Sequence, residues 1–354
     1  MKFINAKYEI WEPKECNTKN ILEAIERAAK VCYKSEGNIK EGSALPFIKG
    51  IIKRGHTSVL EHGSVYFRVN ITSVQKLNNT YNDIARFFDD VYMFYDITDP
   101  SDTTKCVAKT AFSENNNMYY NVYTNMRFVY EKCPKLFWDI VLERDLPDFV
   151  KLFTPEENDK YRRQTVFFTA DQRITEEFIR HRIASPNKES TRYCCYSSNK
   201  HGNELTFIIP LKMKNIIREN DNVYKCFYGD VLRWKVNDKF IDSADINCLL
   251  DGFETSEKIY KTLTTVHNWR AEEARIILPL GTKADLVLTN SLVDWWNGRN
   301  EIVDNYTANE DIGEVQGKRI KGFFGLRCDN AAHPQARELA IPLMEDFERR
   351  GWKW

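Results

Sequence analysis

Neither a long apolar stretch nor an excess of charge of one sign is present in this sequence. Its 354 residues contain no run of eighteen apolar residues, and the N-terminus, MKFINAKYEIWEPKE, lacks a signal-peptide core. We therefore expect a cytoplasmic protein with no membrane contact. Lys and Arg total 51, as do Asp and Glu, so the formal net charge is zero. This balance argues against a nucleic-acid partner, although it leaves room for a local basic cleft.

Sequence patterns for metal and disulfide sites are also missing. The nine cysteines form no CxxC pair, and only Cys194 and Cys195 are adjacent. We expect reduced, mostly buried thiols, and neither a zinc ribbon nor a redox site of the thioredoxin type. The six histidines occur in no HExxH or HxH pattern, so no metal site is predicted.

The residues that are present indicate a globular protein of mixed structure. The chain is 42% hydrophobic and 29% charged, which is typical of a protein with an apolar core. Apolar residues at helical spacing predict helices over 18–33, 45–54, 175–183, 256–274 and 334–349. Alternating residues predict strands over 64–70, 164–170, 205–209 and 284–289. Because crossover helices do not regularly separate these strands, we predict an α+β fold with antiparallel strands.

Two segments differ in amino-acid composition from the rest of the chain. Residues 72–161 are rich in Asn, Asp and aromatic residues, with helical patches at 84–94 and 126–131 but no catalytic-looking cluster. We interpret them as an insertion packed on the main body. Residues 297–321 are polar and partly acidic, and predict an exposed loop. The predicted organisation is a single domain, 1–354, with insertions at about 72–161 and 297–321.

The segment 180–193, RHRIASPNKESTRY, has the highest density of chemically active side chains. It holds three arginines, several hydroxyl groups and one acid, Glu189. Arginine binds phosphate through two parallel hydrogen bonds, and hydroxyl groups add more. Pro186 ends a helix and favours extended backbone at 184–185, so a helix would run into a hydroxyl-rich turn and form an anion pocket. On composition alone, a solvated charged loop is the favoured alternative.

The order of residues in this segment resembles the signature of flavin-dependent thymidylate synthases, RHR followed by seven residues and a serine. Here Arg180, His181, Arg182 and Ser190 match it, and Arg192 and Tyr193 follow. The continuation ESTRYCCYS is similar to QESTRYCNYS, which is found in one branch of the family. Many members have a glutamate two residues before the serine. This chain has Lys188 there, so the role of that glutamate is not transferred.

Three further segments resemble the family in the same order along the chain. GHTSVLEH (55–62) is similar to an HxxxxEH element whose last histidine, here His62, lies near the flavin. EEARIILPLGTKADLVLT (272–289) resembles the element whose arginine, here Arg275, binds the nucleotide phosphate. GFFGLRCDNAAHPQARELAIPL (322–343) resembles the C-terminal element whose arginine, here Arg327, reaches the pyrimidine. Together the matches cover about half of the chain.

The chain also departs from the family pattern at positions that help to hold the flavin. Val293 stands where an arginine is expected, Ser291 where an asparagine is expected, and Gly322 where a histidine or asparagine is expected. Asn290 is one residue away from Ser291 and is a candidate substitute. Glu177 replaces a glutamine that contacts the nucleotide in some members, and no role is assigned to it.

The resemblance implies a fold with a central, mostly antiparallel sheet flanked by helices and carrying insertions. It implies an enzyme that methylates dUMP to dTMP with FAD as cofactor, with NADPH and methylenetetrahydrofolate as co-substrates, and without a cysteine nucleophile. It also implies a homotetramer whose active sites form where subunits meet.

The resemblance further implies the roles of individual residues. The candidate catalytic residues are Arg327, which would polarise the pyrimidine carbonyl, and Ser190, which would bind dUMP rather than attack it. Ser190, Arg192, Arg275 and Arg327 would bind dUMP. The flavin neighbours would be His62, Arg180, His181 and Arg182.

Two other functions were weighed against this one. A non-catalytic flavin- or nucleotide-binding homologue would account for the departures at 291, 293 and 322. An RNA-binding module using the basic stretch 180–203 is disfavoured by the neutral charge and by the lack of interleaved aromatic residues. A cysteine-dependent thymidylate synthase is disfavoured because its motif order is different.

Overall fold

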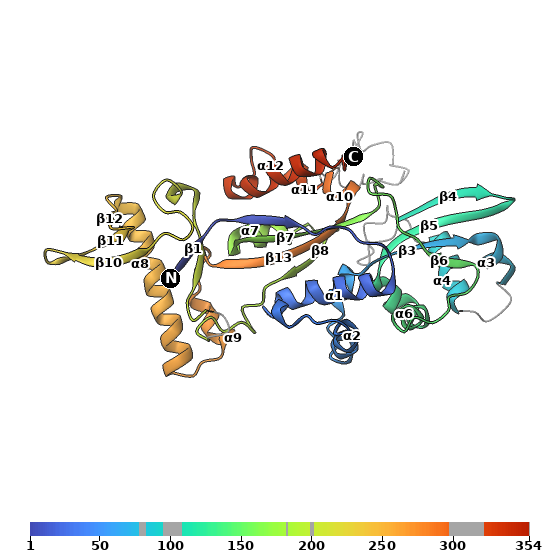
Figure 1. Cartoon of the computed structure of the whole chain (residues 1–354), viewed down its shortest axis with the longest axis horizontal. Coiled ribbons are helices and arrows are strands. Elements are labelled where there is room, and N and C mark those ends of the chain that lie inside the picture. Colours follow the sequence, from blue (N-terminus) through green and yellow to red (C-terminus); the bar gives the residue numbers. More distant parts are fainter. Residues whose placement is uncertain (78–82, 95–107, 182, 199–201, 297–321, 354) are drawn as a thin grey trace, which may run out of the picture.

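The structure is a computed structural model of the chain, and it describes residues 1–77, 83–94, 108–181, 183–198, 202–296 and 322–353 (Figure 1). At its centre is a four-stranded antiparallel sheet in the order β2-β7-β13-β8. Its strands are β2 (Lys7–Ile10), β7 (Arg163–Asp171), β13 (Lys283–Ser291) and β8 (Ser185–Lys188). The long strands β7 and β13 pair from Lys283↔Asp171 to Ser291↔Arg163.

Helices cover both faces of this central sheet (Figure 1). One face packs on α1 (Thr18–Cys32), where Ala28 and Val31 of the helix contact Val287 of β13. The other face, with Leu286 and Leu288, packs on α7, α10, α11 and α12. Successive residues of a strand point to opposite faces, so β13 is buried along its whole length. The expected mixture of helices and antiparallel strands is confirmed.

A second antiparallel sheet, β4-β5-β3-β6, lies beside the first and is built mainly from residues 72–161 (Figure 1). Strand β3 (Ser64–Asn70) was predicted, whereas β4 (Ala108–Glu114), β5 (Asn117–Asn125) and β6 (Val150–Leu152) were missed. The Asn-rich composition obscured the hairpin, because Asn115 and Asn116 have φ angles of 48° and 61° and form its tight turn. This sheet shares one hydrophobic core with α1 and α2.

Two smaller sheets complete the fold. β1 (Lys2–Ile4) pairs with β9 (Thr206–Ile208) in parallel, an exception to the antiparallel prediction. β10 (Val223–Tyr228), β11 (Val231–Val236) and β12 (Lys239–Phe240) form an antiparallel sheet. It packs near α8 (Ala244–Lys261), which begins twelve residues before the predicted helix at 256. The early turns of α8 were missed because they are rich in Asp, Asn and Gly, which are poor helix formers.

The remaining helices connect the strands of these sheets and pack on them. Their bounds are α2 (Ala44–Lys53), α3 (Ile71–Leu77), α4 (Asp83–Phe94), α5 (Met126–Lys132), α6 (Pro134–Val141), α7 (Gln172–Phe178), α9 (Ala271–Ala274), α10 (Leu292–Trp296), α11 (Phe323–Arg327) and α12 (Pro334–Arg349). Short 3-10 turns span Glu36–Asn38, Thr57–His62, Leu211–Met213 and Arg275–Ile277, and a π-helical turn spans Thr262–Val266.

Helix boundaries agree with the sequence where end signals are strong. Gly55 follows α2 with a φ angle of 72°, which suits glycine, and α12 has the predicted bounds. Helix α7 is wrong at both ends, because Asp171 caps it by accepting from the Ile174 N–H and it ends at Phe178. The loop predicted over 297–321 lies outside the described residues.

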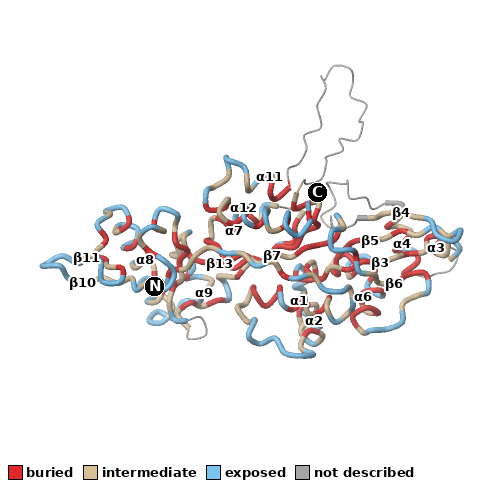
Figure 2. Tube along the Cα trace, turned by 45° about the horizontal axis from the view of Figure 1, so that its top comes forward, coloured by how far each residue is buried: buried red, intermediate tan, exposed pale blue. Residues whose placement is uncertain are grey.

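Buried residues concentrate along the central sheet and its covering helices (Figure 2). The cysteines that the structure describes are free thiols, yet only Cys133 and Cys194 are buried and Cys248 is exposed, so the prediction of mostly buried thiols is wrong. Cys106 lies outside the described residues. Within the described ranges, no helix is long and apolar enough to cross a membrane. No group of three His, Cys, Asp or Glu side chains is suited to a metal among those same residues.

Candidate functional site

The turn that carries Ser190 is held between helix α1 and strand β13. The Ser190 N–H donates to the carbonyl of Cys32, the last residue of α1, at 2.9 Å. The Glu189 N–H donates to the Asp285 carbonyl at 2.7 Å. The Ser190 hydroxyl accepts from the Arg192 N–H at 3.3 Å, which closes the turn. Backbone contacts from two elements therefore fix the position of the serine.

Arg275 joins this turn from a segment 84 residues away. Its Nη1 atom lies 3.4 Å from the Thr191 hydroxyl, and Arg192 pairs with Glu272 at 3.3 Å. We call Ser190, Thr191, Arg192 and Arg275 the serine–arginine cluster. Both arginines are exposed, and the Arg192 side chain is 54% exposed. Two guanidinium groups beside two hydroxyl groups, with N–H donors still open to solvent, can bind a phosphate group.

A buried network of charges supports the serine–arginine cluster from below. The Glu189 carboxylate is fully buried and contacts Lys283 at 2.8 Å and Lys34 at 3.2 Å. It also accepts from the Tyr196 hydroxyl at 2.7 Å, and Lys283 pairs with Asp285 as well. Burial alone would raise the pKa of Glu189, but the two lysines outweigh it and lower that pKa. The network ties together α1, β13 and the turn.

A second cluster forms around Arg327 at the end of α11. Its Nε donates to His181 Nε2 at 3.0 Å, and its Nη1 pairs with Glu177 at 2.9 Å. Its Nη2 also donates to the Glu177 carbonyl. We call Glu177, His181 and Arg327 the Arg327 cluster. A buried arginine needs a partner, and among the described residues Glu177 supplies the counter-charge of Arg327.

The Arg327 cluster fixes the protonation state of His181. Burial and the nearby Arg327 charge lower the pKa of His181 to about 3. Because arginine only donates, His181 Nε2 accepts and the proton of the neutral ring lies on Nδ1. The ring also packs against Phe323, with centroids 4.9 Å apart.

The two clusters lie on opposite faces of the central sheet. The Arg327 cluster adjoins Phe323, which belongs to the core on the α11–α12 side. The serine–arginine cluster is attached to the end of α1, which covers the other face. One chain therefore brings the residues predicted to bind dUMP into two groups rather than one.

His62 lies on the α1 face, away from the other predicted flavin neighbours. Its Nδ1 is 2.8 Å from the Thr289 hydroxyl, which in turn contacts Thr165 at 2.8 Å. Burial and the nearby Arg163 lower the pKa of His62 to about 3, so the ring is neutral. Its buried Nε2 atom has no hydrogen-bond partner in the described part of the chain.

The remaining predicted residues are less constrained. Arg180 is exposed, and Arg182 lies outside the described residues. Lys188, which replaces the usual glutamate, pairs with Glu176 of α7 at 2.5 Å. Asn290 uses its side-chain oxygen to accept from the Ser291 N–H at 3.1 Å.

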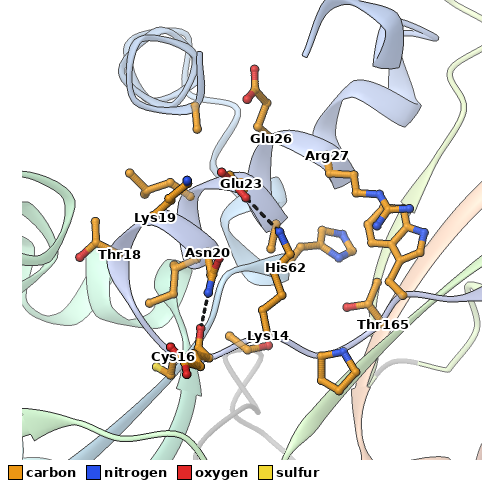
Figure 3. A pocket seen from close by; sticks show the side chains of 18 of the residues that line it. Lys14, Cys16, Thr18, Lys19, Asn20, Glu23, Glu26, Arg27, His62 and Thr165 are labelled. Atoms are coloured by element: carbon orange, nitrogen blue, oxygen red, sulfur yellow. Dashed lines mark hydrogen bonds and ion pairs between the residues drawn. The ribbon is translucent and has the colours of Figure 1, made fainter. Parts of the chain in front are cut away.

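A pocket of about 980 Å³ opens beside His62, between the first half of α1 and the start of β7 (Figure 3). Figure 3 shows His62 among Lys14, Glu23, Arg27 and Thr165. Residues 141–143 and 154–155 of the insertion add one wall. Like His62 Nε2, the buried atoms Trp11 Nε1 and Arg162 Nη1 of lining residues lack a hydrogen-bond partner within the described residues. The pocket has the size of a cofactor site.

Sequence reasoning missed two features of this region. The charge network was hidden because Lys283 and Asp285 stand in an otherwise apolar strand, although polar residues at alternate positions of a buried strand are a usable signal. The pair Arg162–Arg163, at the start of β7, was not singled out. Arg163 donates to Ser185 at 2.9 Å and to the Glu61 carbonyl at 3.2 Å, so it links β8 to the His62 segment.

Comparisons with known proteins agree with the resemblance in the sequence. The family described as thymidylate synthase complementing protein matches residues 16–79 and 164–321. A curated relative, the flavin-dependent thymidylate synthase of Pyrococcus abyssi (strain GE5 / Orsay), is 25% identical over 176 residues. That alignment covers 50% of this chain and 50% of the relative, so the chain spans about half the length of the relative it matches.

Two solved structures are also similar to the chain. The UMP/dUMP methylase PolB from Streptomyces cacaoi bound with 5-Br dUMP is 15% identical and has a TM-score of 0.34. The same methylase bound with 5-Br UMP is 13% identical and also has a TM-score of 0.34. Each comparison covers 99% of this chain and 92% of the other. Because the family match extends over more than half of its residues, this chain belongs to the thymidylate synthase complementing protein family.

Proposed function

We propose that this protein catalyses the reductive methylation of dUMP to dTMP with FAD, NADPH and methylenetetrahydrofolate. The observation that carries the proposal is the meeting of distant signature residues: Arg275 contacts Thr191 across 84 residues, and Arg327 contacts His181 across 146. A relative named as a flavin-dependent thymidylate synthase supports the same reaction. The proposal thus rests on residues that converge in space as well as on their order in sequence.

The serine–arginine cluster is our proposed site for the phosphate and sugar of dUMP. Arg192 and Arg275 are both exposed and keep N–H donors that no acceptor in the described part of the chain engages. Charge-assisted hydrogen bonds from guanidinium to phosphate are among the strongest in proteins. Ser190 would donate its hydroxyl proton to the nucleotide. Among the described residues, the hydroxyl is hydrogen-bonded only to the Arg192 N–H, and no described histidine bonds to it to activate it as a nucleophile.

Arg327 is our proposed group for the pyrimidine. Its positive charge is already paired with Glu177, so we expect Arg327 to bind a neutral carbonyl group rather than a phosphate. With Nε on His181 and both Nη atoms engaged by Glu177, the guanidinium is held before substrate arrives. A donor fixed in advance stabilises negative charge that develops on the pyrimidine oxygen during methyl transfer.

The residues beside the large pocket fit a bound flavin. The neutral His62 ring and the Trp11 indole present buried polar atoms to which no described residue forms a hydrogen bond, and a flavin ring carries both hydrogen-bond donors and acceptors. His62, Arg180, His181 and Arg182 would hold FAD. The chemistry that bound FAD contributes is hydride transfer to the incoming one-carbon unit.

Cysteine protonation supports a reaction without a cysteine nucleophile. Cys32 adjoins the serine–arginine cluster, and burial raises the pKa of its thiol to about 11. Burial likewise raises the pKa of Cys328, next to Arg327, to about 11. The thiolate is the nucleophilic form, so both side chains are poor nucleophiles near neutral pH.

We also propose a homotetramer in which each active site combines the serine–arginine cluster of one subunit with the Arg327 cluster of another. The two clusters lie on opposite faces of the sheet, so a single chain does not surround one dUMP with both. Exposed apolar side chains lie next to Arg192 and along residues 266–280, the segment that carries Arg275, as expected for a subunit contact. They are Tyr193, Val266, Trp269, Ile276 and Leu280, and Ile276 is 84% exposed.

Further expectations accompany this function. We propose one domain over residues 1–354 with insertions at about 72–161 and 297–321, since the second sheet shares a core with α1 and α2. We propose a cytoplasmic enzyme without a metal, a membrane contact or a nucleic-acid partner, because dUMP and the reduced cofactors are cytoplasmic metabolites and the net charge is zero.

The experiment that tests the function is anaerobic. The purified protein is examined for flavin absorbance, reduced with NADPH, and then given dUMP and methylenetetrahydrofolate while dTMP is assayed. Bleaching by NADPH followed by reoxidation with dTMP formation is the expected result. A yellow protein that never forms dTMP would identify a non-catalytic flavin-binding homologue. A colourless protein without dUMP affinity would refute the proposal.

A further inference from the structure

Position 293 lacks the arginine that the resemblance expects there for holding flavin, and the structure brings a different arginine next to it. The Leu292 N–H donates to the Arg162 carbonyl at 2.9 Å, and the Val293 N–H donates to the Lys160 carbonyl at 2.9 Å. These bonds extend the pairing of β13 with β7 beyond Ser291↔Arg163. Arg162 therefore opposes the residue directly before Val293, although it lies in the stretch 80–163 that the family match does not include.

The Arg162 side chain is buried, and no described residue supplies a counter-charge to it. It is 6% exposed, and its Nη1 atom has no hydrogen-bond partner among the described residues. None of the ion pairs that join those residues includes Arg162. A buried cation without a partner is costly, so such a group is normally satisfied by an anion. Arg162 is also among the residues lining the 980 Å³ pocket.

The other charges of this pocket do not compensate Arg162. Glu26 pairs with Lys30 at 2.7 Å and Glu23 with Lys14 at 3.0 Å. Glu12 pairs with Arg350 at 2.8 Å. The remaining lining carboxylates, of Glu15, Glu41 and Glu143, are exposed to water. His62, the lining histidine, is neutral. Of the two buried arginines that line the pocket, Arg163 donates to the Ser185 hydroxyl and the Glu61 carbonyl. Arg162 has no such side-chain hydrogen bond among the described residues.

We infer that Arg162 binds the phosphate groups of the dinucleotide cofactor in this pocket and takes the place of the arginine absent at position 293. The inference rests on the proposed function, because it takes FAD as the cofactor. FAD carries a pyrophosphate, which a buried guanidinium binds through charge-assisted hydrogen bonds. Asn290 and Ser291 do not fill this role, since their side chains bond the Ser291 N–H and Asp294.

Flavin titrations of the apo-protein test this assignment. Arg162→Leu should weaken FAD binding about 10- to 100-fold and FMN binding to a similar extent, while riboflavin, which has no phosphate, binds as to wild type. The thermal midpoint of the apo-protein should not fall, because the variant removes an uncompensated buried charge. Arg162→Gln keeps a polar side chain and should give the same FAD loss, which covers the case in which Arg162→Leu does not fold.

A matched control and a rescue sharpen the result. Lys160 is the neighbouring cation, is exposed and does not line the pocket, so Lys160→Leu should leave FAD affinity unchanged. Val293 is half-buried, and adding Val293→Arg to the Arg162→Leu chain should restore most of the lost affinity. Failure of this rescue would overturn the claim that Arg162 replaces position 293.

The outcomes also separate this inference from the proposed function. Equal FAD affinity of wild type and Arg162→Leu would overturn the role of Arg162 while leaving a flavoenzyme intact. A variant that keeps FAD but loses NADPH affinity would assign Arg162 to the reductant and likewise overturn the inference. A wild-type protein that binds no flavin would refute the proposed function itself.

Discussion

The serine–arginine cluster and the Arg327 cluster contain the same kind of cation but present it differently. Arg192 and Arg275 are exposed, and among the described residues each has one side-chain hydrogen-bond partner, at 3.3 Å and 3.4 Å respectively. Arg327 is largely buried and makes three hydrogen bonds within its cluster. The serine–arginine cluster therefore has N–H donors that are accessible to a ligand. In the Arg327 cluster, hydrogen bonds to Glu177 and His181 engage most of the donors and hold the guanidinium in one orientation.

This difference fits two tasks in one reaction. A phosphate brings its own charge, so an open pair of arginines can bind it without a compensating group in the protein. Charge on a pyrimidine carbonyl develops only in the transition state, and a donor stabilises it best when held in place beforehand. The serine–arginine cluster is supported by the buried ion pairs of Glu189 with Lys283 and Lys34.

The largest expected effect comes from mixing subunits that are damaged in different clusters. Arg192→Ala and Arg327→Ala should each be nearly inactive alone. If each active site takes one cluster from each of two subunits, random co-assembly of the two variants restores about a quarter of the sites. dTMP formation by the co-expressed mixture measures this recovery.

The control mixture uses two variants of the same cluster. Arg192→Ala mixed with Arg275→Ala should show no recovery, because no subunit then carries an intact serine–arginine cluster. If the first mixture also fails to recover while both variants assemble normally, both clusters serve one site within a single chain, and the proposed arrangement is wrong.

The next largest effect is expected for Glu189, whose buried ion pairs support the serine–arginine cluster. Glu189→Gln leaves two lysines around a neutral amide, and breaking a buried ion pair from one side costs about 3–5 kcal/mol of unfolding free energy. Glu26→Gln is the matched control, since Glu26 is 1% exposed and pairs with Lys30 at 2.7 Å, away from the turn. Both should lower stability in urea unfolding, but only Glu189→Gln should also weaken dUMP binding.

The pH dependence of this network has a definite sign. The lysines hold the pKa of Glu189 below its ordinary value of 4.5, so its ionised form stabilises the folded state. This contribution is complete above about pH 4.5 and is lost as the pH falls through the lowered pKa. Unchanged dUMP affinity in a folded Glu189→Gln protein would show that the network supports stability alone.

A smaller effect is expected from Arg275, one of the two exposed arginines of the serine–arginine cluster. Arg275→Ala removes one charged phosphate contact and should weaken dUMP binding by about 2 kcal/mol, or roughly 30-fold, without changing the thermal midpoint. Arg270→Ala is the control, because Arg270 is exposed on the same segment and pairs with Glu272 at 3.2 Å but does not contact Thr191. Equal loss in both variants, by calorimetric titration, would point to general attraction rather than a site.

The comparison also shows which parts of the site the sequence could predict. Ser190, Arg192, Arg275 and Arg327 could be proposed from the sequence because insertions leave the spacing within each family motif unchanged. In the structure Arg192 contacts Glu272, Arg275 contacts Thr191 and Arg327 contacts His181, so these arginines join segments that are far apart in sequence. That they form two groups could not be predicted. It depends on which face of the sheet α1 covers, and pairing of distant strands determines this rather than local spacing.

The fold was predictable where one periodicity dominates a segment. Helix α12 and strand β3 have the predicted bounds. Strands β4 and β5 were missed because Asn residues, which favour turns, occur within and between them. Arg162 could not have been singled out, because its lack of a counter-charge arises only when α1, β7 and the insertion enclose it.

The smallest expected effect compares the two histidines, one on each face of the sheet. Burial lowers the pKa of His62 and of His181 from 6.5 to about 3, with a further contribution from Arg163 and Arg327 respectively. The unfolded chain takes up these protons near pH 6.5 and the folded chain only near pH 3. Stability from each histidine is therefore complete above pH 6.5 and falls as the pH is lowered towards 3.

Between pH 7 and pH 5.5 each histidine should account for about 1 kcal/mol of lost unfolding free energy in the apo-protein. Urea unfolding at both pH values measures the loss, and His181→Asn and His62→Asn should each reduce it by the share of one histidine. Equal shares are expected, because the folded pKa of both histidines, about 3, lies well below this pH range. A wild-type protein whose stability does not change over this range would contradict the buried, neutral state of both rings.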